Sequence, residues 1–150
     1  MSMDIASKMK ARLFPQVTTF DTSSGAFVPL PYFLRNSLSL FSRASWQIYT
    51  YILMKCGPGG AYWLSNTEIA TACQYSRGNK ISVHLKQLRE LGFIVVKRDR
   101  DGRQAIAVPS PYLVLSSLAA RGAIDEELLD MLNDDLERAG FARLKSCMTG

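Results

Sequence analysis

The sequence predicts a mainly α-helical protein with a small antiparallel β-sheet, an α+β fold. Apolar residues recur at helical spacing in several segments beyond residue 42, and two β-rich segments flank the turn "RDG" at 100–102. The chain has 150 residues, of which 47% are hydrophobic. It is therefore long enough for one globular domain with a core and a few appended elements.

The first 41 residues predict an arm followed by a hairpin. Residues 1–14 carry a weak helical pattern through Ile5, Met9 and Leu13. Two β-rich stretches within 17–28 surround turn-forming residues, which predicts a hairpin or an extended ribbon. We expect the prolines that follow to end it, and a short helix to cover 32–36.

A longer helix is expected from Ser42 or Ser45, since either serine is a suitable N-cap. Apolar residues recur at helical spacing up to Cys56, and the Gly-Pro pair at 57–58 ends the helix. The sequence "GPGG" lacks the Lys-Ser/Thr that completes a phosphate-binding loop, so we interpret it as a turn. A short strand, "AYWL", follows.

Two short helices joined by a tight turn come next, which is the sequence form of a helix-turn-helix. Ser65 and Glu68 predict a capping box that opens the first helix, which ends near Gln74. Ser76 is the expected cap of the second helix, and Gly92 has the place of a left-handed C-terminal cap.

A β-hairpin is predicted after the second helix, from "FIVVKRD" at 93–99 and "RQAIAV" at 103–108. This order of helix, strand, two helices and hairpin resembles the winged helix-turn-helix family over residues 43–108. The most specific part is "LSNTEIATACQYSRGNKISVHLKQLRELGFIVVKRDRDGR", with a capped "EIA" helix, a second helix ending "LKQLRELGFI" and a basic wing. The preceding segment is similar to the lead-in of many bacterial, phage and plasmid winged-helix proteins, including replication initiators.

Together with the patterns at the two ends of the chain, the resemblance predicts three parts. Residues 1–41 are an N-terminal arm and hairpin that pack on the core, 42–109 are the winged helix-turn-helix domain, and 110–150 are a helical dimerisation or interaction segment. It also implies sequence-specific binding of double-stranded DNA, as a transcription regulator or as a plasmid or phage replication or partition factor.

The side chains of the second helix agree with DNA binding. Its apolar side carries Ile81, Leu85 and Leu88. The opposite side suits a major groove, because Lys reaches guanine or phosphate, Asn and Gln bond adenine, and Val contacts the thymine methyl. The candidate groove residues are Arg77, Asn79, Lys80, Val83, Lys86 and Gln87. The candidate wing residues, which grip phosphates or enter the minor groove, are Lys97, Arg98, Arg100 and Arg103.

Two alternatives stand beside this interpretation. The charged side of the helix and the turn of the wing can be ordinary solvated surfaces. The fold can also serve as a protein-protein interaction module without DNA binding, because fold does not fix function. A basic helix together with a basic wing favours DNA, since a protein-contact module needs neither.

Charge is distributed unevenly along the chain. Residues 1–60 have six Lys and Arg against two Asp and Glu, and residues 61–110 have eight against four. Residues 111–150 reverse the balance, with four against seven. A positive body suggests a polyanionic partner, and the acidic end suggests a different role.

The acidic end predicts two helices, with Asp125 as the cap of the second and Gly140 as its stop. Their apolar faces are formed by Leu113, Leu115 and Leu118, and by Ile124, Leu128, Leu132 and Leu136. Two helices of this size do not cover both faces alone. We expect a homodimer through them, the alternative being a fold-back onto the monomer core.

Catalysis, metals and cofactors are not expected. His84 is the only histidine, and the three cysteines are widely spaced and read as buried thiols. Trp46, Tyr49 and Trp63 are expected to be core aromatics. No apolar run approaches the ~20 residues of a membrane span, and the first residues lack a secretory apolar segment, so we expect a cytoplasmic protein. Nothing in the sequence identifies a small-molecule effector.

Overall fold

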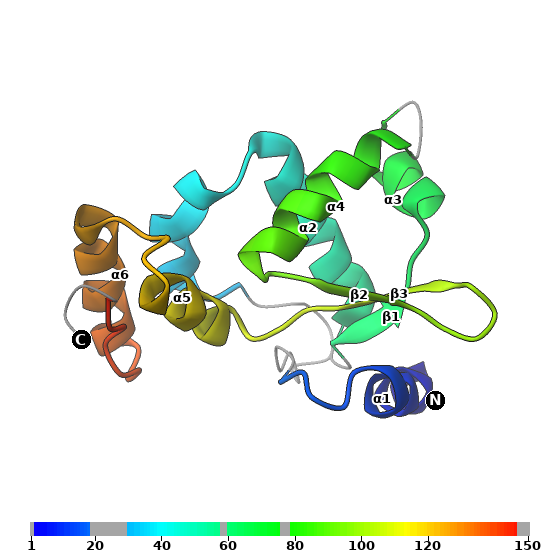
Figure 1. Cartoon of the computed structure of the whole chain (residues 1–150), viewed down its shortest axis with the longest axis horizontal. Coiled ribbons are helices and arrows are strands. Elements are labelled where there is room, and N and C mark those ends of the chain that lie inside the picture. Colours follow the sequence, from blue (N-terminus) through cyan, green and yellow to red (C-terminus); the bar gives the residue numbers. More distant parts are fainter. Residues whose placement is uncertain (1, 19–29, 58–59, 76–78, 147–150) are drawn as a thin grey trace.

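The computed structural model describes residues 2–18, 30–57, 60–75 and 79–146 (Figure 1). The predicted fold class is confirmed, because this part of the chain is mainly helical with one three-stranded antiparallel sheet. In chain order the elements are α1 (Ser2–Leu13), the 3-10 helix η1 (Tyr32–Leu40), α2 (Arg43–Cys56), β1 (Ala61–Trp63), α3 (Asn66–Ala72), α4 (Asn79–Leu91), β2 (Val95–Arg98), β3 (Gln104–Ala107), α5 (Pro111–Ala120) and α6 (Glu126–Arg138).

The N-terminal predictions have mixed outcomes. The arm is helical, as its weak pattern indicated. The hairpin predicted within 17–28 falls largely on 19–29, outside the described residues, and Val17 and Thr18 ahead of it are irregular. The short helix predicted for 32–36 is a 3-10 helix that continues to Leu40.

Both candidate caps of α2 take part in its N-terminus. The Ser42 hydroxyl accepts the backbone N–H of Ser45 at 3.0 Å, and the Ser45 hydroxyl accepts the N–H of Ser42 at 2.9 Å. These reciprocal bonds form a capping box in which serine replaces the usual Glu or Gln. The helix ends at Gly57, whose φ of 59° is the left-handed conformation that glycine adopts without strain.

The capping box predicted for α3 is confirmed, with Ser65 accepting the N–H of Glu68 at 3.1 Å and Glu68 accepting the N–H of Ser65 at 3.3 Å. The residues directly after α3, 73–75, include no glycine, and Gln74 adopts a φ of 61° there. This left-handed conformation costs a side chain with a Cβ about 1–2 kcal/mol. Gly92 ends α4 as predicted, with a φ of 94° and its amide bonded to the carbonyl of Leu88 at 3.0 Å.

The sheet has the strand order β1-β3-β2, and its two faces are covered by different helices. Tyr62, Ile106 and Val96 lie opposite one another on the face that packs on the main core with α2, α3 and α4. The other face is made of small side chains, and α1 lies across it (Figure 1). Its buried members are Ala61, Ala105 and Ala107, against which Met9 and Phe14 pack.

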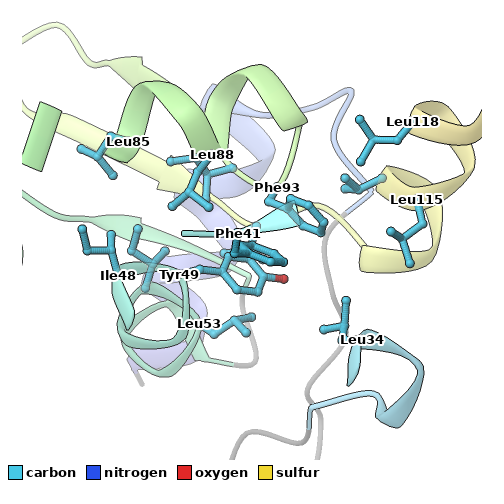
Figure 2. Close-up of a cluster of buried hydrophobic side chains, with 14 of the residues drawn as sticks. Leu34, Phe41, Ile48, Tyr49, Leu53, Leu85, Leu88, Phe93, Leu115 and Leu118 are labelled. Atoms are coloured by element: carbon cyan, nitrogen blue, oxygen red, sulfur yellow. The ribbon is translucent and has the colours of Figure 1, made fainter. Parts of the chain in front are cut away.

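The main core is centred on three aromatic rings (Figure 2). The ring centre of Phe41 is 4.6 Å from that of Phe93 and 5.5 Å from that of Tyr49. Leu115 and Leu118 of α5 belong to the same cluster. One core therefore includes residues from both the central helices and the C-terminal helices.

The C-terminal helices are also held by polar contacts within the chain. Asp135 of α6 accepts hydrogen bonds from Arg35 Nε at 3.0 Å and Nη2 at 2.8 Å, and a further one from Asn36 of η1. Buried Asn133 bonds both the backbone N–H and the carbonyl of Leu144, which folds the tail back onto α6.

This packing bears on the predicted dimer. Most of the residues expected to form the two apolar faces are buried within the single chain, although Leu113 is exposed. The helices therefore need no partner to cover those faces. This agrees with the fold-back onto the monomer core, the alternative that the sequence left open.

Candidate nucleic-acid interface

The exposed side of α4 brings several of the predicted groove residues together. Lys80, Val83 and Lys86 are exposed, and Gln87 is half-buried. Val83 is 70% exposed although it is apolar, while Ile81 and Leu88 on the opposite side are fully buried. Arg77 and the side chain of Asn79 lie outside the described part of the chain.

Gln87 has a partner inside the molecule. Its side-chain oxygen accepts a hydrogen bond from the Ser42 hydroxyl at 3.3 Å, which joins α4 to the N-terminus of α2. The Gln87 side chain is thus positioned by the α2 cap, and its amide nitrogen takes no part in that bond.

A residue that the sequence reasoning missed connects α4 to the sheet. The Asn66 amide donates to the Ser82 hydroxyl at 3.2 Å, and its oxygen accepts from Gln104 Nε2 at 2.9 Å. Gln104 also donates to the carbonyl of Leu64 at 2.9 Å. Because Gln104 pairs with Arg98 next to the turn, these bonds fix the turn end of the β2–β3 hairpin relative to the exposed side of α4.

The turn of the hairpin is organised by Asp99. Its carboxylate accepts the backbone N–H groups of Asp101 and Arg103, each at 3.0 Å, and the indole N–H of Trp63 at 2.8 Å. The backbone N–H of Gly102 bonds the Asp99 carbonyl at 3.0 Å. The turn is therefore held in one conformation before any ligand binds.

The same contacts affect the ionisation of Asp99. Desolvation acts to raise the pKa of its carboxyl, but the bonds from Arg103, Trp63 and Asp101, with the charge of Arg103, outweigh it and lower the pKa. Asp99 is thus a structural residue of the turn as well as a negative charge in it.

Adjacent cations of the hairpin lie on opposite faces of the sheet. Lys97 pairs with Ala105 and Arg98 pairs with Gln104, so Arg98 shares its face with Ile106 and the main core. Arg98 borders a hollow of about 320 Å³ with Asn66 and Gln104, and it donates to the carbonyl of Gly102 at 2.9 Å.

Lys97, a candidate wing residue, also makes contacts within the chain. Its ammonium donates to the carbonyl of Leu13 at 2.9 Å and lies 5.6 Å from the ring centre of Phe14. It therefore secures α1 to the sheet, which the sequence did not indicate.

Trp63 is also not the core residue that was expected. It is half-buried on the outer face of the sheet, bonded to Asp99, and the Arg103 guanidinium lies 4.8 Å from its ring centre. This cation–π contact orients Arg103, whereas Arg100 at the tip is exposed.

Three other titratable side chains in the described part of the chain, two cysteines and the histidine, are buried or half-buried. Cys56 and Cys73 are buried thiols as predicted, and burial raises the pKa of Cys56 to about 12. Half-buried His84 lies beside Tyr75, with ring centres 5.9 Å apart. In the part of the chain that the structure describes, no three His, Cys, Asp or Glu residues are grouped to hold a metal ion.

Comparison of the chain with family models, with curated proteins and with solved structures finds no match. No helix among the described residues combines the length and the apolar character that crossing a bilayer requires. The interpretation of this surface therefore rests on its own residues.

Proposed function

We propose that the chain is a winged helix-turn-helix protein that binds double-stranded DNA sequence-specifically. In this proposal α3 and α4 are the helix-turn-helix, α4 enters the major groove, and the β2–β3 hairpin is the wing. The protein acts as a transcription regulator or as a plasmid or phage replication or partition factor. It works in the cytoplasm without catalytic activity.

The observation that carries the proposal is the exposed side of α4. An apolar side chain, Val83, is 70% exposed between Lys80 and Lys86. A solvated helix face gains nothing from such an arrangement. A major groove does match it, because the thymine methyl is an apolar target and guanine and phosphate accept from lysine.

The ordered hairpin is a second support. Arg98 and Arg100 extend from a turn that Asp99 and Trp63 already hold. A wing fixed in advance loses little conformational entropy on binding. The hydrogen bonds of Asn66 keep the wing in a fixed position relative to α4.

The proposal is tested by selecting a preferred duplex from a random library and measuring affinity by fluorescence anisotropy. If one module covers ~3–5 phosphates, log K falls against log salt with a slope of about −3 to −4.5. Lys80→Ala should cost roughly 1–3 kcal/mol on the selected site and relax its sequence preference.

Val83→Ala should weaken the preference for thymine over other bases in the selected site. Met54→Ala is the matched control, because Met54 is an apolar residue of α2 that is 64% exposed. Absence of binding to any duplex would refute DNA binding and favour the protein-contact alternative. Equal losses for the two apolar variants would show that α4 does not read bases.

The homodimer remains a prediction. With the inner faces of α5 and α6 covered, a dimer through these helices uses their outer sides, where Leu113 of α5 and Met131 of α6 are exposed. Light scattering of the full chain, alone and with duplex, decides it. A monomer at tens of micromolar under both conditions would contradict the dimer.

A further inference from the structure

The N-terminal helix α1 lies beside the wing although it is distant from α4. It packs on the outer face of the sheet, while α4 packs through the main core on the inner face (Figure 1). Met9 and Phe14 are buried against alanines of the strands, and Lys97 bonds the last residue of the helix. The helix is thus fixed to the same hairpin that supplies the wing.

This packing places two cations of α1 near the hairpin, Arg12 beside its turn and Lys8 beside Trp63 of β1. Lys8 and Arg12 are four residues apart, so they lie on one side of the helix, and both are exposed. Lys8 and Arg12 border one hollow with Trp63. Arg12 borders a second hollow of about 370 Å³ with Arg100 at the wing tip, which Asp99 and Asp101 of the turn also line.

The charge of this region is strongly positive. The helix side and the hairpin together contribute six cations, Lys8, Arg12, Lys97, Arg98, Arg100 and Arg103, against the two carboxylates of Asp99 and Asp101. Asp99 is occupied by the turn and by Trp63. Among the described side chains, neither Lys8 nor Arg12 takes part in an ion pair.

We infer that Lys8 and Arg12 form a second phosphate-binding strip, which continues the wing surface and grips the DNA backbone beyond the wing. This inference rests on the proposed function. Since α1 and α4 lie on opposite faces of the sheet, the strip reaches phosphates that flank the segment read by α4. It contacts phosphates only, so it adds affinity without sequence preference.

The test compares two double variants that lose the same charge. Lys8→Gln with Arg12→Gln removes the strip, and Lys10→Gln with Lys55→Gln removes two cations from positions outside it. Each is measured on the selected site in a long duplex of about 25 bp and in a duplex trimmed to about one helical turn, ~10 bp, around the α4 segment.

On the long duplex, loss of two phosphate contacts makes the salt slope shallower by about 1.8, which corresponds to roughly 10- to 30-fold weaker binding at about 0.15 M salt. On the short duplex the strip variant binds like the unmodified chain. The control variant stays within about threefold on both duplexes.

Different failures have different meanings. If the unmodified chain binds the long duplex and the strip variant binds it equally well with the same slope, the strip is refuted while the proposed function stands. Equal losses in the strip and control variants would also refute it, because they would reflect net charge alone. If the unmodified chain binds no duplex, both proposals fail.

Discussion

Asp135 offers the sharpest test of how the C-terminal helices are held. Its side chain is 4% exposed and accepts three hydrogen bonds, two from Arg35 and one from Asn36. Replacing it by alanine removes all three. We expect Asp135→Ala to lower the free energy of unfolding measurably, with Asp135→Asn having a smaller effect.

The magnitude follows from the exposure of the partners. A hydrogen bond to a charged group contributes about 1.5–3 kcal/mol, so three would suggest a large loss. The Arg35 side chain is 60% exposed, however, and regains water when it is unpaired, which discounts its two bonds. We therefore expect Asp135→Ala to cost about 2–3 kcal/mol near neutral pH.

The cost should depend on pH in a defined direction. The hydrogen bonds from Arg35 lower the pKa of Asp135. The positive charges of Arg35 and Arg138 and the hydrogen bond from Asn36 also lower it, while desolvation raises it. A lowered pKa gives stability that is present above the ordinary value of 3.8 and is lost as pH falls through the lowered one. The difference between unmodified chain and variant should thus be constant down to about pH 4 and shrink below it.

Urea unfolding followed by circular dichroism measures these differences. Asp134→Asn is the matched control, because Asp134 is the neighbouring carboxylate on α6 and is exposed. It should change stability by less than about 0.5 kcal/mol. If Asp135→Asn and Asp134→Asn are equally stable at every pH, the Asp135 contacts do not hold α6 on η1.

Three further predictions concern other positions. The buried Tyr49 hydroxyl has no hydrogen-bond partner among the described residues, so Tyr49→Phe should raise the free energy of unfolding by about 1 kcal/mol, and a loss of that size in urea unfolding would contradict this. Gln74→Gly should relieve the left-handed strain and stabilise the protein by roughly 0.5–1 kcal/mol, whereas Gln74→Ala should not. In a Trp46→Phe background, the fluorescence emission of Trp63 should shift as pH falls below 3.8, because the Asp99 carboxylate, whose pKa is lowered, becomes protonated there. Asp99→Asn should abolish this shift, whereas Asp101→Asn should retain it. An unchanged titration in Asp99→Asn would assign the shift to another group.

Local signals in the sequence were sufficient for α2, α3 and α6 and for the end of α4, but not for η1, which continues to Leu40. The caps at Ser65, Asp125 and Gly92 depend on residues three or four positions apart, so the pattern contains all that determines them. The exposed side of α4 could be predicted for the same reason, because helical spacing separates Val83 from Ile81 and Leu85.

The contacts that the sequence did not predict join distant segments. Asn66 bonds residues 16 and 38 positions away, and Asp135 bonds Arg35 across 100 positions. The alternation of side chains along a strand does predict that Lys97 and Arg98 lie on opposite faces of the sheet. It does not reveal that α1 covers the face on which Lys97 lies, since that depends on tertiary packing.

The division of the buried residues into two clusters has a consequence for the order of unfolding. Met9 and Phe14 belong to the outer cluster with the alanines, and half-buried Tyr62 packs against both clusters among the described residues. Detaching α1 leaves the aromatic centre and the α5–α6 packing intact, so α1 forms a cooperative unit of its own. Its amides should exchange with solvent through a low-energy local opening, while those of α2 and α4 require opening of the whole molecule. If the proposed complex with DNA is held by α4 and the β2–β3 hairpin, it can form before α1 packs on the sheet, and the packing of α1 is then a second step with its own rate.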